Sequence, residues 1–350
     1  MIKIQNVYYM LAYVYQVLRE NGYTYLSSEE FDNMQNLLAA ILSKGLANQI
    51  KRGLGREYIL QNELLDSPRG KINVTDTIKR SPFERKVSCE FDEFSENSYF
   101  NRILKSTAVL MTHSQDVDVK IKKTIKRSLL FLEKVDCISV SDIRWDVLNF
   151  NRNNDSYKML LNICYLIING LLLSQQNGTT KFSDFLDEKH MHSLYEKFIL
   201  EYYKRHYPCL KPASSKIAWQ TDDNIIDFLP EMRSDITLKY MDKTLIIDAK
   251  YYGKSMQTGM YNKQTVHSGN LYQIFTYVKN KDIANSGNVS GMLLYAKTDD
   301  AMSPDFTYKL SGNTIKVATL DLNQPFNKIS MQLDEIVCEW QNALLSAKVC

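Results

Sequence analysis

The chain has 350 residues, of which 44% are hydrophobic and 24% are charged. These values are typical of a folded protein with a sizeable core, which excludes an intrinsically disordered chain. The net charge is only +3, so a nucleic-acid-binding surface requires local clustering of Lys and Arg rather than an overall basic charge.

The cysteines and the most apolar stretch exclude further classes of protein. The six cysteines include no CxxC pair, which argues against a zinc ribbon or a thioredoxin-like motif. The stretch 159–173 is interrupted by Asn162, Asn169 and Gly170, and it is shorter than a membrane span. The N-terminus lacks the pattern of a secretory signal. We therefore expect a cytoplasmic protein with no membrane contact.

The first half of the chain is predicted to mix helices with strands. Two strand-like segments flank a turn at Arg69 and Gly70, whereas apolar residues recur at helical spacing elsewhere. A run of five basic residues within 116–134 either contacts phosphate groups or forms a solvated helix face. The predicted helices cover about 4–18, 31–42, 97–113, 116–134 and 157–175, and the predicted strands cover 57–65 and 83–92.

A polar segment from Gln175 to Thr180 is the candidate domain boundary. It predicts an N-terminal domain of mixed helices and strands over 1–178 and a second domain over 179–350. The second domain alternates helices and strands in the order α-β-β-β-α-β, which indicates a mixed sheet flanked by helices and an α/β (α+β) class. Its predicted helices cover 188–206, 268–280 and 330–346, and its predicted strands cover 215–220, 234–240, 243–250, 289–296 and 313–320.

The candidate site lies in the two strands at 234–240 and 243–250. Residues two apart in a strand face the same side, so Asp248 and Lys250 share a face. A hairpin in which Tyr240 pairs with Lys243 places Asp235 directly opposite Asp248. Facing side chains in neighbouring strands lie within about 5.5 Å at Cβ, so the sequence predicts two adjacent carboxylates beside a lysine.

Two carboxylates at this separation repel each other unless a cation lies between them, and Mg²⁺ is the hard ion that prefers oxygen ligands. We therefore expect Asp235 and Asp248 to bind Mg²⁺, with Mn²⁺ as a substitute, and the carbonyl group of Ala249 to complete the ligand set. The metal would polarise a phosphodiester, and Lys250 would orient or deprotonate the attacking water. The alternative is a surface salt bridge from Lys250 to Asp248 or Asp242.

Two helices supply further candidates. Gln273 and Tyr277 are four residues apart and share one face of the helix that follows the strands. Glu196 precedes the sheet and would bind a metal-held water; the alternative for Glu196 is an exposed pair with Lys197 or Arg205. No GxxxxGK[ST] loop is present, so we expect this chain to bind no nucleotide by itself.

The Asp235, Asp248-Ala249-Lys250 and Gln273-x-x-x-Tyr277 pattern resembles the PD-(D/E)XK nuclease superfamily. Within it, most of the chain is similar to the McrC family, the nuclease subunits of McrBC-type modification-dependent restriction systems. Ser234 stands where that family usually has proline. Further similar segments are Asn6–Tyr13, Arg69–Ile72, Glu93–Asn97, Asn101–Lys105 and Leu194–Phe198.

The resemblance implies a restriction-endonuclease-like fold over 179–350 and an endodeoxyribonuclease in which Lys250 is the catalytic lysine and Gln273 lies near the scissile phosphate. It also implies that the N-terminal domain docks on a hexameric McrB-like AAA+ GTPase, and that the substrate is double-stranded, methylated DNA. Two alternatives remain open at this stage. One is a non-catalytic regulator of an AAA+ partner, and the other is a PD-(D/E)XK nuclease that acts in repair.

Overall fold

A computed structural model of the chain divides into two units. One unit, here called the sheet unit, comprises Met1–Glu30 and Leu186–Cys350, and the inserted unit comprises Phe31–Phe185. The structure describes residues 2–19, 23, 26, 29, 31–80, 85–151, 154–177, 188–223, 225–251, 256–258, 264–297 and 304–346. Every helix within these ranges is too short or too polar to span a lipid bilayer.

The N-terminal helix α1 (Ile4–Val14) corrects the predicted division of the chain. The sequence pattern assigns residues 1–178 to one domain, but α1 packs on α7 (Glu188–His206), which belongs to the second half. The side-chain amide of Asn6 donates hydrogen bonds to the carbonyl oxygens of Leu322 (2.7 Å) and Gln324 (2.8 Å). The predicted boundary at 178–179 itself lies outside the described residues.

The inserted unit is built on four helices that pack on one another. Asn33 caps the first of them, because its side chain accepts a hydrogen bond from the amide of Asn36, and Ser98 and Asp118 cap the next two in the same way. These helices are α2 (Met34–Arg52), α4 (Tyr99–His113), α5 (Val119–Leu129) and α6 (Asp155–Asn177).

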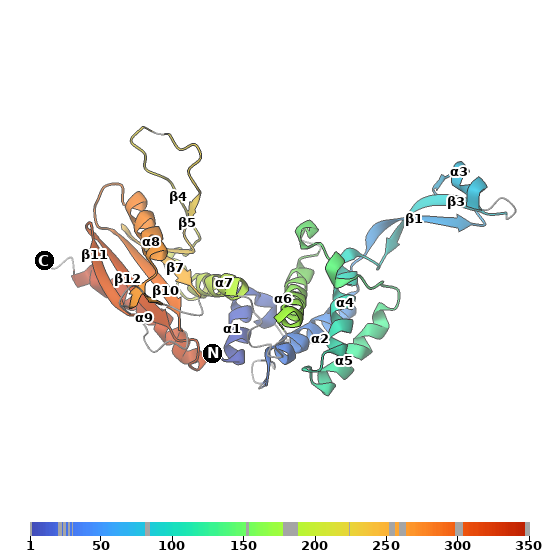
Figure 1. The fold of residues 1–350 in the computed structure, drawn as a ribbon, viewed down its shortest axis with the longest axis horizontal. Coiled ribbons are helices and arrows are strands. Elements are labelled where there is room, and N and C mark those ends of the chain that lie inside the picture. The colour runs from blue at the N-terminus through green and yellow to red at the C-terminus, as the bar shows by residue number, and fades with distance from the viewer. Residues whose placement is uncertain are drawn as a thin grey trace. The chain divides into compact units, whose positions relative to one another are not determined.

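A three-stranded antiparallel sheet in the order β1-β3-β2 extends away from these helices (Figure 1). A short helix, α3 (Val74–Arg80), packs on it. Gly70 at the predicted turn has φ +69°, and a Cβ there would lie 2.4 Å from the carbonyl oxygen of Glu90, so the turn requires glycine. The strands are β1 (Glu57–Leu65), β2 (Lys71–Ile72) and β3 (Val87–Ser95).

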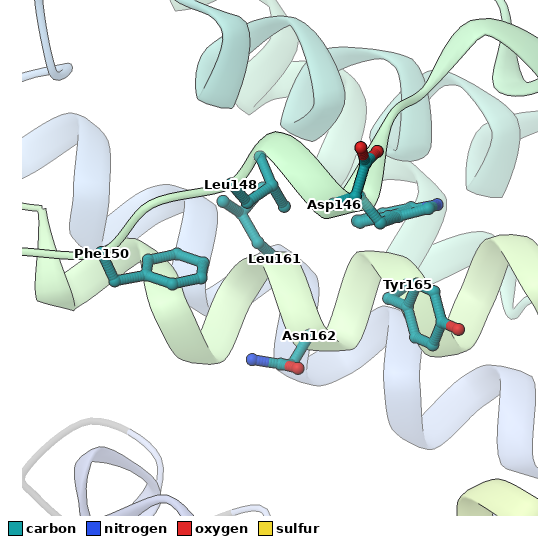
Figure 2. A pocket seen from close by; sticks show the side chains of 7 residues that line it. Asp146, Leu148, Phe150, Leu161, Asn162 and Tyr165 are labelled. Atoms are coloured by element: carbon teal, nitrogen blue, oxygen red, sulfur yellow. The ribbon is translucent and has the colours of Figure 1, made fainter.

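The inserted unit also contains a pocket of about 370 Å³ between α6 and the preceding segment, which includes Trp145 and Phe150. Figure 2 shows that the carboxyl group of Asp146 points away from α6. That carboxyl group pairs with Arg144 at 3.2 Å. Leu148, Leu161 and Asn162 also line this pocket.

The sheet unit contains a five-stranded mixed sheet in the order β11-β12-β10-β7-β6. The central strands β7, β10 and β12 are parallel, and the outer strands β6 and β11 are antiparallel to their neighbours. The predicted mixed sheet is therefore confirmed. The strands are β6 (Ile236–Tyr240), β7 (Lys243–Lys250), β10 (Val289–Ala296), β11 (Phe306–Leu310) and β12 (Asn313–Leu320).

The helix α8 (Ser268–Lys281) covers one face of this sheet and buries Ile274 and Val278 against Ile246 and Leu293. α7 packs on β6 and β7, and α9 (Phe326–Ser346) packs on β12 (Figure 1). Shorter strands are β4 (Lys216–Ile217), β5 (Met232–Arg233), β8 (Met256–Thr258) and β9 (Gln264–Val266). Single 3-10 turns lie at Gln16–Arg19, Leu130–Leu132, Val140–Asp142, Trp145–Val147 and Pro208–Leu210.

Candidate active site

The hairpin of β6 and β7 has the predicted register. Tyr240 pairs with Lys243, and the ladder continues to Ile236 and Ile247. Asp235 directly precedes β6, so one further step along the same register places it beside Asp248. The side-chain carboxylate of Asp235 accepts a hydrogen bond from the backbone amide of Ala249 at 2.8 Å. The two ends of the hairpin therefore meet where the sequence predicts.

Lys250 lies next to Asp248 at the end of β7. Its Nζ atom is 2.9 Å from Oδ2 of Asp248, and the two side chains are only 9% and 1% exposed. The salt-bridge alternative names Asp248 as a partner of Lys250, but it places the pair on the surface, whereas the observed pair is buried. The other named partner, Asp242, is exposed and accepts a hydrogen bond from Asn288.

The helix α8 supplies a third neighbour of Lys250. The Nζ atom of Lys250 donates a hydrogen bond to Oε1 of Gln273 at 3.1 Å, and the amide nitrogen of Gln273 donates to the hydroxyl oxygen of Tyr277 at 2.9 Å. Tyr277 thereby fixes which end of the Gln273 amide faces the lysine. The predicted shared face of Gln273 and Tyr277 is confirmed.

Burial and mutual repulsion determine the protonation of the two carboxyl groups. Burial, followed by the charges of Asp248 and Glu196, raises the pKa of Asp235 to about 8. Burial also raises the pKa of Asp248, and the charge of Lys250 and hydrogen bonds from Lys250 and Asp235 oppose that rise. Without a cation, at least one proton therefore stays on this pair near neutral pH.

The donor set around these carboxyl groups suits a divalent cation. Oδ2 of Asp248 is buried, and the ammonium group of Lys250 lies 2.9 Å from it. The amide and the carbonyl of a strand residue point to the same edge of the strand, so the carbonyl of Ala249 points to the Asp235 side. Carboxylate and carbonyl oxygens are the ligands that Mg²⁺ prefers. The residues present therefore fit this ion.

Glu196 pairs with a residue that the sequence analysis did not name. Its Oε1 atom lies 2.7 Å from Nδ1 of His192, one turn earlier on α7, rather than beside Lys197 or Arg205. Its charge acts on Asp235 and Asp248. However, no three His, Cys, Asp or Glu side chains come together as a metal-ligating group anywhere in the described part of the chain.

Two neighbours of the site have roles that the sequence analysis missed. The amide of Ser234 donates to the carbonyl oxygen of Ser215 at 3.0 Å, a bond that proline could not form. Tyr295 of β10 pairs in register with Lys250, and its hydroxyl accepts a hydrogen bond from the side chain of Asn270 at 2.9 Å. Asn270 lies three residues before Gln273, and this helical spacing is the signal that could have indicated it.

Comparison with known proteins agrees with the sequence pattern. Residues 3–296 match the profile of the McrBC 5-methylcytosine restriction system component family. The chain is 30% identical over 344 residues to the type IV methyl-directed restriction enzyme EcoKMcrBC of Escherichia coli K12. That alignment covers 97% of this chain and 98% of the relative.

Two solved structures from Thermococcus gammatolerans are also similar. One contains McrB AAA+ hexamers with bound McrC and matches with 17% identity and a TM-score of 0.48, covering 91% of this chain and 72% of that one. The other is a McrBC complex that matches with 20% identity and a TM-score of 0.42, covering 58% of each chain. Because the profile spans most of the sequence and the relative aligns over almost its full length, the chain belongs to the McrBC 5-methylcytosine restriction system component family.

Proposed function

We propose that this chain is the DNA-cleaving subunit of a GTP-dependent, modification-dependent restriction complex and that cleavage requires Mg²⁺. The relative from E. coli is a methyl-directed restriction enzyme, which supports a role in the cleavage of modified DNA. The proposal assigns the cleavage site to Asp235, Asp248 and Lys250, within a PD-(D/E)XK nuclease fold.

The meeting of two carboxyl groups, Asp235 and Asp248, at one poorly solvated place is the observation that carries this proposal. Burial raises the pKa of both groups, so their charged forms require a compensating cation. A lysine held by Gln273 lies directly beside Asp248. An isolated structural ion pair would not explain why a second, half-buried carboxyl group, Asp235, sits at the same place with a raised pKa.

The residues of the chain divide the chemistry among them. Asp235 and Asp248 would hold Mg²⁺ together with the carbonyl of Ala249; the bound ion supplies polarisation of the phosphodiester and acidification of a water molecule. Lys250 places a positive charge beside the reacting phosphate, where it offsets the negative charge that develops on the oxygen atoms. Gln273 orients the ammonium group of Lys250, and Tyr277 orients Gln273.

The partner in this proposal is a hexameric AAA+ GTPase that recognises methylated double-stranded DNA. The small sheet of the inserted unit is the surface that we assign to it. Tyr58 and Phe94 pair across β1 and β3 with ring centroids 5.0 Å apart, yet they are 75% and 54% exposed. Leu60 lies two residues after Tyr58 on the same face of β1 and adds further exposed apolar surface. Exposed apolar groups gathered on one small element are typical of a protein interface.

The cleavage proposal is tested with Asp248→Asn and Lys250→Gln in the presence of the partner GTPase, GTP, Mg²⁺ and methylated DNA. We expect each variant to lose at least about a hundredfold in cleavage rate while it still stimulates GTP hydrolysis. Asp242→Asn is the matched control, because Asp242 lies exposed at the turn of the same hairpin. This control is expected to cut normally.

Metal binding provides a readout that does not depend on activity. Titration calorimetry with Mn²⁺ should detect one ion for the intact chain and for Asp242→Asn, but none for Asp248→Asn. Undiminished cleavage by Asp248→Asn would refute the site. Stimulation of GTP hydrolysis by an intact chain that never cuts would instead support the regulator alternative.

A further inference from the structure

A second pocket lies in the sheet unit, away from the carboxylate site, and its volume is about 300 Å³. It forms where α1 and the following 3-10 turn meet the C-terminal end of α7 and the start of α9. The aromatic rings of Tyr9, Tyr13 and Phe326 line it, and the rings of Tyr9 and Phe326 are stacked at 4.5 Å. This volume is at the lower end of the range of about 300–1,000 Å³ that is typical of small-molecule sites.

Two arginines place positive charge on this aromatic wall. The guanidinium of Arg19 lies 3.8 Å from the centroid of the Tyr13 ring, and that of Arg205 lies 5.9 Å from the same centroid. Neither arginine pairs with a carboxylate among the described residues. In addition, Nη2 of Arg19 is buried without a hydrogen-bond partner. A buried guanidinium donor in this state is unfavourable unless a ligand accepts its hydrogen.

The carboxylate of Asp334, which acts on this pocket, is already occupied by other groups. Asp334 acts electrostatically on Tyr13, but its Oδ1 atom accepts hydrogen bonds from the hydroxyl groups of Tyr202 (2.7 Å) and Tyr207 (2.8 Å). The hydroxyl of Tyr13 instead lies 2.8 Å from Nε2 of His206, which keeps the ring in place. Among the described residues, Asp334 therefore does not neutralise the two arginine charges.

We propose that this pocket binds a nucleoside monophosphate group, either as a free nucleotide or as the phosphorylated end of a DNA strand. Two guanidinium groups match the charge of a phosphate monoester, which is about −2 near pH 7, better than the single charge of a carboxylate or an internal phosphodiester. The aromatic walls suit a flat base, because bases stack on such rings. The absence of a GxxxxGK[ST] loop excludes only sites of the phosphate-loop class, which bind through backbone amides.

The pocket is separate from the proposed cleavage site but is joined to it by one rigid element. Glu196 and Arg205 are nine residues apart on α7, which corresponds to about 14 Å along a helix. The proposal stands on the pocket alone and does not require that Asp235 and Asp248 bind a metal. The pocket proposal and the cleavage-site proposal can therefore be tested separately.

The test is titration calorimetry on the full chain with EDTA present, so that no divalent ion contributes. Adenosine 5′-monophosphate is expected to bind, and adenosine or inorganic phosphate alone should bind at least about tenfold more weakly. Arg205→Gln should weaken binding of the nucleotide about tenfold. Lys204→Gln is the matched control, since it removes the same charge from the neighbouring residue, which pairs with Glu201 outside the pocket. This control should bind normally.

Two oligonucleotides distinguish the sources of the ligand. If the strand with a 5′-phosphate binds more tightly than the mononucleotide, and the 5′-hydroxyl strand does not, the ligand is a DNA end. If the mononucleotide binds as tightly as the 5′-phosphorylated strand, the ligand is a free nucleotide. Absence of saturable binding by both phosphate-bearing probes would overturn the proposal. An equal loss in Lys204→Gln, or equally tight binding of the dicarboxylate glutarate, would also overturn it.

Photo-crosslinking locates the bound probe directly. Label from 8-azidoadenosine monophosphate should map to peptides that contain Tyr9, Tyr13 or Phe326, and label confined to peptides around Lys250 would contradict the assignment. Arg19→Gln is expected to abolish this label, with circular dichroism to confirm the fold. Because Arg205 is exposed, its variant keeps the test decisive even if Arg19→Gln does not fold.

Discussion

At the scale of single residues, the burial of Asp235 and Asp248 has the largest chemical consequence. Each carboxyl group has a raised pKa, chiefly because burial disfavours its charged form. A protein gains nothing in stability from such a pair unless a cation or a proton compensates it. The pair therefore lowers the stability of the metal-free fold, and a bound ion would compensate for this loss.

This cost predicts how stability depends on pH. A carboxyl group whose pKa is higher in the folded than in the unfolded state binds more protons when folded, so stability falls as pH rises between the two values. For Asp235 this window extends from the ordinary value of 3.8 to about 8. We expect the metal-free protein to be less stable at pH 8 than at pH 5, as measured by urea unfolding at each pH.

The contribution of Asp235 is isolated by comparison with Asp235→Asn. The amide carries no titrating proton, so the decrease in stability across this window should be smaller in the variant. Adding Mg²⁺ at pH 8 should stabilise the intact chain and leave Asp235→Asn unchanged. Parallel pH profiles for the two proteins would show that Asp235 does not titrate in this range.

Tyr277 gives a second prediction at this scale. Tyr277→Phe removes the acceptor that orients Gln273, so the amide can turn and its oxygen loses its fixed position beside Lys250. We expect cleavage to fall about tenfold and stability to fall by about 1 kcal/mol, measured by nicking of methylated DNA and by urea unfolding. Tyr272→Phe, on the exposed side of the same helix, should change neither; equal losses in both variants would contradict the prediction.

The sequence allowed the placement of Asp235, Asp248 and Lys250 to be predicted because a tight hairpin fixes its register and side chains alternate along a strand. The partner of Glu196 was not predictable in the same way. His192 and Lys197 are both near Glu196 in sequence, and the rotamer that decides between them depends on how α7 packs on the sheet. Local spacing carries no information on that packing.

At the scale of elements, strands were predicted well where burial is continuous. The predicted bounds of β7, β10 and β12 match the structure, because β7 and β10 contain apolar runs and β12 alternates between buried and half-buried residues. β11 was missed because its residues are mostly exposed, and a strand at the sheet edge leaves no apolar run in the sequence. The predicted strand 215–220 contains only the two-residue β4, and its two-residue partner β5 is too short to leave a periodic pattern.

The contact between α8 and the sheet supports a prediction at this scale. A Cβ atom at Gly291 of β10 would lie 2.8 Å from side-chain carbons of both Ile274 and Val278. Gly291→Ala should therefore push α8 away from the sheet and lower the free energy of unfolding by about 1–3 kcal/mol. Because α8 carries Gln273, cleavage should decrease as well.

A glycine on the same helix provides the control for this effect. A Cβ atom at Gly269 would meet no other atom within 4 Å, so Gly269→Ala should be neutral or slightly stabilising. Urea unfolding of both variants measures the difference. The packing argument fails if Gly291→Ala is as stable as Gly269→Ala.

At the scale of the whole molecule, two segments that are far apart in the chain, residues 1–30 and 186–350, belong to one structural unit. The sheet unit takes its first helix from the N-terminus, and the inserted unit interrupts it in sequence. Helical periodicity showed that α1 is apolar on most sides, but periodicity does not identify the partner of a helix. For this reason the mixed fold was predictable from sequence, whereas the assignment of residues 1–30 to the sheet unit was not.

This arrangement predicts that residues 186–350 need α1 in order to fold. Val7, Met10 and Leu11 are almost fully buried, and burial of such side chains contributes about 1.5–3 kcal/mol each, or roughly 5–9 kcal/mol together. That is comparable with the total stability of a typical domain, about 5–15 kcal/mol. A chain that begins at residue 186 should therefore unfold at much lower urea concentration, or show no cooperative transition.

A chain in which a Gly/Ser linker joins residue 30 to residue 186 should keep a cooperative transition, because it retains α1 and loses only the inserted unit. If both shortened chains unfold alike, α1 contributes little to the sheet unit, and the division at residue 30 does not describe how the protein is stabilised.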